Sequence, residues 1–172
     1  MDYDIEYYEN MLRNYSKTAE QISEVRWRFI SQLNPKTVLD YGSGVGWFRA
    51  FRPAGVSVWS YDIMPVPQTG IDLRMYDVVC FWDVLEHIPD FSRIEPVLAL
   101  ARHIAASLPL LPNNNPQQLS EWKHFKPGEH LHYFSHDTLS ALMKTYGFVE
   151  LKKGMPECPP REGIWSYLFA KQ

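Results

Sequence analysis

A short glycine-rich segment has the residue types needed to hold a nucleotide close to the backbone. In TVLDYGSGVGWF (residues 37–48), an apolar run ends at Asp40 and is followed by three alternate glycines beginning at Gly42. Glycine tolerates positive φ and allows a ligand to approach the backbone closely. Asp62, at the end of the next apolar run, can accept hydrogen bonds from both hydroxyls of a ribose. These residues favour a site for an adenosine-containing ligand.

The spacing of the loop separates two classes of nucleotide. Loops that bind dinucleotides follow G-x-G-x-x-G, because the pyrophosphate lies on a helix N-terminus. Here Trp47 stands where the last glycine of that pattern would be, and Asp40 would place a second negative charge near a pyrophosphate. The carboxylate suits a cationic group such as an amine or a sulfonium. An NAD-dependent oxidoreductase is therefore disfavoured against an enzyme that uses an amino-acid-bearing adenosine.

Histidines are the candidates for proton transfer. His130 and His132 lie among aromatic side chains and could act as a general base if the substrate loses a proton. The alternative is a loop of histidines that only pack. A zinc site built from these histidines is a third alternative; Cys158 could join it, but the spacing matches no standard ligand pattern, and no metal is expected. Glu86 and His87 are interpreted as a capping and packing pair. Four histidines fall within residues 124–136: His124, His130, His132 and His136.

The segments that must position these residues alternate between strand and helix patterns. Apolar residues spaced by three and four predict helices, and short apolar runs bounded by glycine or proline predict strands. The alternation favours an α/β fold with a mainly parallel sheet. Helices are predicted over 18–33, 45–51, 90–101 and 135–147, and strands over 37–42, 56–64, 76–85, 103–111, 148–154 and 163–171.

The chain of 172 residues suits one domain. Within it we expect an N-terminal helical extension over 1–34, a cofactor-binding half over 36–112, and an acceptor-side loop, helix and strand pair over 113–172. The N-terminal tyrosines could form a lid over the cofactor, or a surface or oligomer contact. They are Tyr3, Tyr7, Tyr8 and Tyr15.

Composition excludes several classes of protein. A hydrophobic fraction of 45% with 15% aromatic residues excludes a disordered chain. A net charge of −3 without a run of Lys or Arg argues against binding to nucleic acid or an anionic membrane. Only two cysteines are present, so no disulfide framework is indicated. Neither a targeting segment nor a long apolar span is evident, and we expect a cytoplasmic protein. Oligomeric state is not predicted.

Four segments together resemble the class I S-adenosylmethionine-dependent methyltransferases. They are VLDYGSGVGWF, YDIMP, YDVVCFWDVLEHIPD and PGEHLHYFSHDTLSALMKTYGF, and the resemblance covers residues 36–152. The small-molecule branch, with its ubiquinone-pathway and sugar methyltransferases, is the most similar. It implies a three-layer Rossmann-like sandwich whose mainly parallel sheet has an antiparallel C-terminal edge strand. It also implies O- or N-methylation of a small-molecule acceptor by in-line displacement, with S-adenosylhomocysteine as the product.

The resemblance also assigns roles to individual residues. The glycine loop would line the methionine end of the cofactor, Asp62 would bind the ribose, and Ile63 would lie beside the adenine. Asp72 stands for an acidic residue near the adenine amino group. The implied cofactor-binding residues are Asp40, Tyr41, Gly42, Ser43, Gly44, Gly46, Asp62, Ile63, Asp72, Trp82 and Asp83.

One segment departs from the family pattern. Fourteen residues separate Asp62 from Asp77, where the family has a helix and a further strand. The third strand and its helix are therefore expected to be missing or shortened. The usual glycine pair before the next strand is replaced by Leu100, Ala101 and Arg102. The alternative function is accordingly a catalytically silent cofactor-binding domain that serves as a partner or scaffold subunit.

Overall fold

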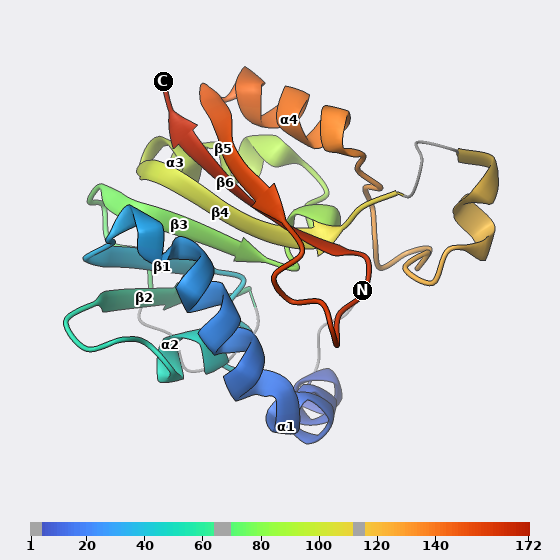
Figure 1. The fold of residues 1–172 in the computed structure, drawn as a ribbon, viewed down its shortest axis with the longest axis horizontal. Coiled ribbons are helices and arrows are strands. Elements are labelled where there is room, and N and C mark those ends of the chain that lie inside the picture. Colours follow the sequence, from blue (N-terminus) through green and yellow to red (C-terminus); the bar gives the residue numbers. More distant parts are fainter. Residues whose placement is uncertain (1–4, 64–69, 112–115) are drawn as a thin grey trace.

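A six-stranded sheet forms the centre of the protein (Figure 1). The computed structural model describes residues 5–63, 70–111 and 116–172. The strand order is β2-β1-β3-β4-β6-β5. The strands are β1 (Thr37–Tyr41), β2 (Ser57–Tyr61), β3 (Tyr76–Trp82), β4 (Ala101–Pro109), β5 (Phe148–Gly154) and β6 (Ile164–Lys171).

Strand directions match the expected mainly parallel sheet. β2, β1, β3 and β4 pair in parallel, whereas β6 is antiparallel to both β4 and β5. The predicted antiparallel pairing of the C-terminal strand is therefore confirmed. β6 itself lies between β4 and β5, so that β5 forms the edge of the sheet.

The connection from β2 to β3 is short, as the spacing of the sequence predicted. Its described residues, 62–63 and 70–75, form neither helix nor strand, and β2 is the other edge of the sheet. The edge strand is thus the one that carries Asp62 at its end.

Helices follow the predicted pattern with shifted ends. The first is longer than predicted: α1 (Ile5–Ile30) continues into the 3₁₀ helix η1 (Ser31–Leu33), and α2 (Trp47–Ala50) is a single turn. The predicted helix over 90–101 divides into η3 (Phe91–Arg93) and α3 (Glu95–Ala99), because Pro96 begins a helix more readily than it continues one. The remaining helices are η2 (Leu85–His87), η5 (Pro116–Glu121) and α4 (His136–Thr145).

Two apolar cores, one on each face of the sheet, give the expected three layers. Side chains of β3 alternate between them: Val79 and Phe81 join the core under α3 and α4, while Val78 and Cys80 join the core under α1 and α2. In Figure 1, α1 crosses the near face of β1 and β3. Within the part of the chain that the structure describes, no helix is long and apolar enough to cross a membrane.

Candidate active site

A cavity of about 890 Å³ opens beyond the carboxyl ends of β1 and β3. One end is lined by the glycine loop and Asp62, and the other by Glu86, His87 and His130. The carboxyl ends of parallel strands are the usual place for ligands in open α/β sheets. We refer to these as the loop end and the histidine end of the cavity.

The glycine loop is tied to the end of the neighbouring strand. The N–H groups of Gly42 and Ser43 both donate to the Tyr61 carbonyl, at 2.8 and 3.0 Å. Gly42 has φ of +76°, and a Cβ there would lie 2.4 Å from a methyl group of Val84. Both the backbone conformation and the available space therefore require glycine at this position.

Asp40 gives the loop end an unusual acid. Its side chain is buried, and Oδ2 has no hydrogen-bond partner among the described residues. Burial raises the pKa of Asp40 to about 7, although the charge of Arg26 lowers it and that of Asp62 raises it further. A cationic ligand group would favour the ionised carboxylate. The site thus fits the amino-acid-bearing adenosine that the sequence indicated.

Asp62 lies beside the loop, where the resemblance places the ribose. It is buried, and Oδ2 accepts a 2.6 Å hydrogen bond from the Gly44 N–H. The rings of Tyr41 and Tyr61 lie 4.9 Å apart and also line the cavity. Ile63 is 71% exposed at the cavity rim.

Asp83 also lines the cavity. It follows β3 with φ of +59°, a conformation that non-glycine residues seldom adopt. Arg161 binds both of its carboxylate oxygens, at 2.6 and 3.0 Å, and Arg26 donates to Oδ2 at 2.7 Å. These two guanidinium groups hold the pKa of Asp83 well below its usual range, against the effect of burial. Asp83 is therefore neutralised by protein cations.

Glu157 completes a four-residue ion network. Its buried carboxylate accepts from Arg26 Nε at 2.9 Å and also from Arg161. Two cations and two anions thus balance one another. The network ties α1 and the segment before β6 to the end of β3.

The histidine end brings together side chains that the sequence did not connect. His130 is buried and lies against His87, with ring centroids 4.9 Å apart. Burial, with His87 and Lys126 nearby, lowers the pKa of His130 to about 4, so its ring is neutral at pH 7. Burial raises the pKa of Glu86 well above its usual range, and the charge of Asp83 adds to this effect.

His132 points elsewhere. Its Nε2 donates to the Ile88 carbonyl at 2.8 Å, and its ring packs between Phe91 and Phe134. It is not among the cavity-lining residues, whereas His130 is. Of the two candidate bases, only His130 therefore lines the cavity.

The structure brings most of the predicted cofactor residues together. Gly46 caps α2 with φ of +82° rather than lining the cavity. Asp72 also lies outside the lining: its carboxylate pairs with Arg74 at 2.5 Å and is 42% exposed. The predicted residues that line the cavity are Asp40, Tyr41, Gly42, Ser43, Gly44, Asp62, Ile63, Trp82, Asp83 and His130.

Sequence reasoning missed the contribution of α1. Ile22, Ser23 and Arg26 line the cavity, and Arg26 also covers the face of Trp82 at 5.0 Å. The available signal was an arginine four residues after Ile22, on the apolar side of an amphipathic helix. Of the proposed lid tyrosines, Tyr3 and the side chains of Tyr7, Tyr8 and Tyr15 lie outside the described residues, and the lid stays a prediction.

Fold and cavity together define a Rossmann-like domain with a nucleotide-type site at the carboxyl ends of its strands. A family model described as a methyltransferase domain matches residues 10–152. The chain belongs to this family and is a methyltransferase, which confirms the resemblance of its motifs.

Solved structures of methyltransferases share the fold at low sequence identity. Magnesium protoporphyrin IX methyltransferase from Synechocystis, with bound S-adenosylhomocysteine, is 20% identical with a TM-score of 0.64, over 89% of this chain and 83% of that one. A 1,6-didemethyltoxoflavin N1-methyltransferase from Burkholderia thailandensis, with bound 1,6-didemethyltoxoflavin and S-adenosylhomocysteine, is 17% identical with a TM-score of 0.68. The match covers 93% of this chain and 82% of that one.

A putative sarcosine dimethylglycine methyltransferase from Galdieria sulphuraria has the same fold. It is 14% identical with a TM-score of 0.69, over 88% of this chain and 86% of that one. A search of curated proteins finds no match.

Proposed function

We propose that this enzyme transfers a methyl group from S-adenosylmethionine to a small-molecule acceptor. The observation that carries the proposal is the loop end, where Asp40, Asp62 and the glycine loop line one cavity. Asp40 has a buried oxygen without a partner among the described residues. The ammonium or sulfonium of the cofactor would satisfy it. Two structural neighbours contain S-adenosylhomocysteine, which is consistent with this donor.

The roles of the chain's own residues follow from their positions. Asp62 would accept the ribose hydroxyls, and Asp40 would pair with the cationic end of the cofactor. When bound, the cofactor supplies an electrophilic methyl group. The protein must then align an acceptor from the histidine end, and alignment alone can contribute about 7–11 kcal/mol to lowering the barrier.

His130 is the better placed of the two candidate bases. It lines the cavity and its ring is neutral at pH 7, so it can accept a proton, although a pKa of about 4 makes it a weak base. His132 donates to a backbone carbonyl outside the lining. We therefore propose His130 as the residue that touches the acceptor. An acceptor that is a hydroxyl or an amine is compatible with this arrangement.

The test is a calorimetric titration of the purified chain with S-adenosylhomocysteine. Asp62→Ala should weaken binding about tenfold or more, because it removes charge-assisted hydrogen bonds to the ribose. Asp137→Ala, the same change at an exposed aspartate, serves as the control. No heat from the folded wild type, or equal affinity in Asp62→Ala, would contradict the assignment. A thermal shift with NADH alone would favour an oxidoreductase instead.

A further inference from the structure

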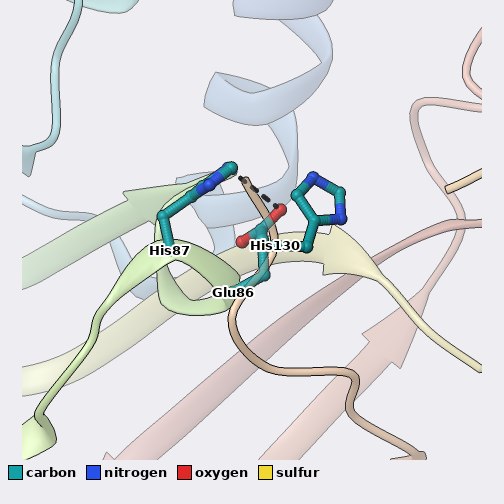
Figure 2. A group of neighbouring side chains, drawn as sticks. All are labelled: Glu86, His87 and His130. Carbon is teal, nitrogen blue, oxygen red and sulfur yellow. Dashed lines mark ion pairs between the residues drawn. The ribbon is translucent and has the colours of Figure 1, made fainter. Parts of the chain in front are cut away.

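Three side chains at the histidine end form a potential metal-binding group. Glu86, His87 and His130 each offer a ligand atom, and these atoms lie within 4.8 Å of one another. Figure 2 shows the two imidazole rings on either side of the Glu86 carboxylate. Glu86 and His87 come from η2 directly after β3, and His130 comes from the loop before α4. Within the described residues, this is the one such group.

The ring of His87 is oriented as a metal ligand would be. Its Nδ1 lies 2.9 Å from the Glu129 carbonyl, which can only accept, so Nδ1 carries the proton. Nε2 then presents its lone pair toward Glu86 Oε1, at 4.0 Å. A backbone carbonyl that fixes the second ring nitrogen is the usual support of a metal-bound histidine.

The loop that carries His130 is fixed to Glu86 itself. The N–H groups of Leu131 and His132 both donate to the Glu86 carbonyl, at 2.8 and 3.1 Å. The two halves of the group are therefore positioned by one backbone connection. Ligand atoms at about 2.1 Å from a tetrahedral zinc ion are about 3.4 Å apart, so these atoms, which lie within 4.8 Å of one another, would approach by about 1.4 Å at most.

Two members of the group, Glu86 and His130, are buried, and each has one polar atom that the protein leaves without a partner among the described residues. Glu86 is 1% exposed and His130 is 7% exposed. Glu86 Oε2 and His130 Nδ1 have no hydrogen-bond partner among the described residues. Buried polar atoms without partners are uncommon in folded proteins.

Nearby cations are already paired with other groups. Arg26 and Arg161 bind Asp83 and Glu157, as described above. Lys126 pairs with Glu129 at 3.0 Å. Within the described residues, no arginine or lysine forms an ion pair with Glu86, and its one neighbour of this kind is the His87 ring, whose Nε2 lies 4.0 Å from Oε1.

We propose that Glu86, His87 and His130 bind a divalent transition-metal ion, of which Zn²⁺ is the type that suits two imidazoles and one carboxylate. Three protein ligands leave at least one coordination position for water or a ligand. All three side chains line the cavity, so the open position faces the space beyond the cofactor. The proposal differs from the sequence-based expectation of no metal, because the third ligand lies 43 positions from the second and the sequence alone did not connect them.

A metal at this position would select the acceptor, an extension that rests on the proposed function. With the ion bound, His130 would be a ligand and would no longer act as the base: an oxygen of a hydroxyl or enol would occupy the open position and release its proton to solvent. Its electron pair would form the new bond to the methyl carbon as the methyl–sulfur bond breaks and leaves the thioether. The acceptor class is therefore an oxygen nucleophile.

The test is a calorimetric titration of chelator-treated protein with ZnCl₂ alone, without cofactor. We expect one ion per chain. His130→Gln should weaken binding by roughly a hundredfold or more, since loss of a supporting residue alone costs 10–100-fold. His132→Gln is the matched control, because His132 lies two residues away and outside the cavity lining. Absence of binding, or equal binding by both variants, would overturn the site.

Two further measurements distinguish a failure of the metal site from a failure of the proposed function. The visible absorption of the Co²⁺-loaded protein should show nitrogen and oxygen ligation, and Glu86→Gln should change that spectrum while circular dichroism shows an intact fold. S-adenosylhomocysteine titrated into metal-free His130→Gln should bind as it does to the metal-free wild type. Failure of metal binding with cofactor binding retained would remove the metal site and leave the proposed function standing.

Discussion

The two ends of the cavity are built in different ways. The loop end comes from residues in or directly after the carboxyl ends of two neighbouring parallel strands, so the pairing of β1 with β2 brings Asp40, Gly42 and Asp62 together. The histidine end joins a turn after β3 to a loop about forty positions later. Short motifs at the carboxyl ends of neighbouring strands are therefore enough to position the proposed cofactor site. The acceptor side depends instead on contacts between segments that are far apart in the sequence.

A second difference concerns charge. At the loop end, Asp40 keeps an oxygen without a partner among the described residues. Asp83, by contrast, forms ion pairs with both Arg26 and Arg161. Of these two carboxylates, only that of Asp40 is therefore available to a cationic ligand, although the resemblance assigned both to the cofactor.

Loss of one network residue should have the largest effect on stability. Arg26→Met should lower the free energy of unfolding by about 3 kcal/mol, because it leaves Glu157 buried with one fewer partner. Arg13→Met, at an exposed pair with Glu9, should change it by less than about 1 kcal/mol. Urea denaturation of both variants measures the contrast. Equal losses of stability in the two variants would show that the buried ion network stabilises the fold no more than an exposed ion pair does.

A change of pH should affect the loop end by an intermediate amount. The pKa of Asp40 is about 7 in the ligand-free protein, and a cationic cofactor favours its ionised form. Affinity for S-adenosylmethionine should therefore rise about tenfold between pH 6 and pH 8, and Asp40→Asn should flatten this dependence. Calorimetry at several pH values, with the Asn variant as control, measures it. A dependence that persists in Asp40→Asn would assign it to another group.

The same pKa has a consequence for the ligand-free fold. The folded value lies above the ordinary value of 3.8, so the protonated acid favours the folded state. This contribution is present at pH 4 and is lost as pH rises to about 7. Bound cofactor offsets the loss, and its stabilising effect should therefore be greater at pH 8 than at pH 6.

The smallest effect should come from Asp72. Its carboxylate pairs with Arg74 outside the cavity lining, so Asp72→Ala should change S-adenosylhomocysteine affinity by less than about twofold. Calorimetry of this variant beside Asp62→Ala shows which of the two aspartates contributes to binding. A tenfold loss of affinity in Asp72→Ala would mean that Asp72 also binds the cofactor, on the adenine side, as the resemblance implied.

Much of the fold follows from the sequence because its signals are local. The apolar run of β3 predicts a strand covered on both faces, and the fourteen residues between Asp62 and Asp77 leave no room for another strand and helix. The position of β6 inside the sheet did not follow, since it depends on which strand its backbone pairs with.

The loop end could be predicted and the histidine end could not. Asp40 and Gly42 belong to one continuous motif, and their relative positions follow from a strand and a turn. His130 and His132 are indistinguishable in sequence. They differ only because the Leu131 and His132 backbones bind the Glu86 carbonyl, which directs one ring into the cavity and the other onto Phe91.

The ion network has a consequence for synthesis of the chain on the ribosome. Arg26 emerges early, Asp83 about midway, and Glu157 and Arg161 close to last among the described residues. Until residue 161 has left the exit tunnel, Arg26 lacks Glu157 and Asp83 lacks Arg161, so the ion network is incomplete. Contacts this distant along the chain form slowly, so the ion network should close only after the segment before β6 has been translated.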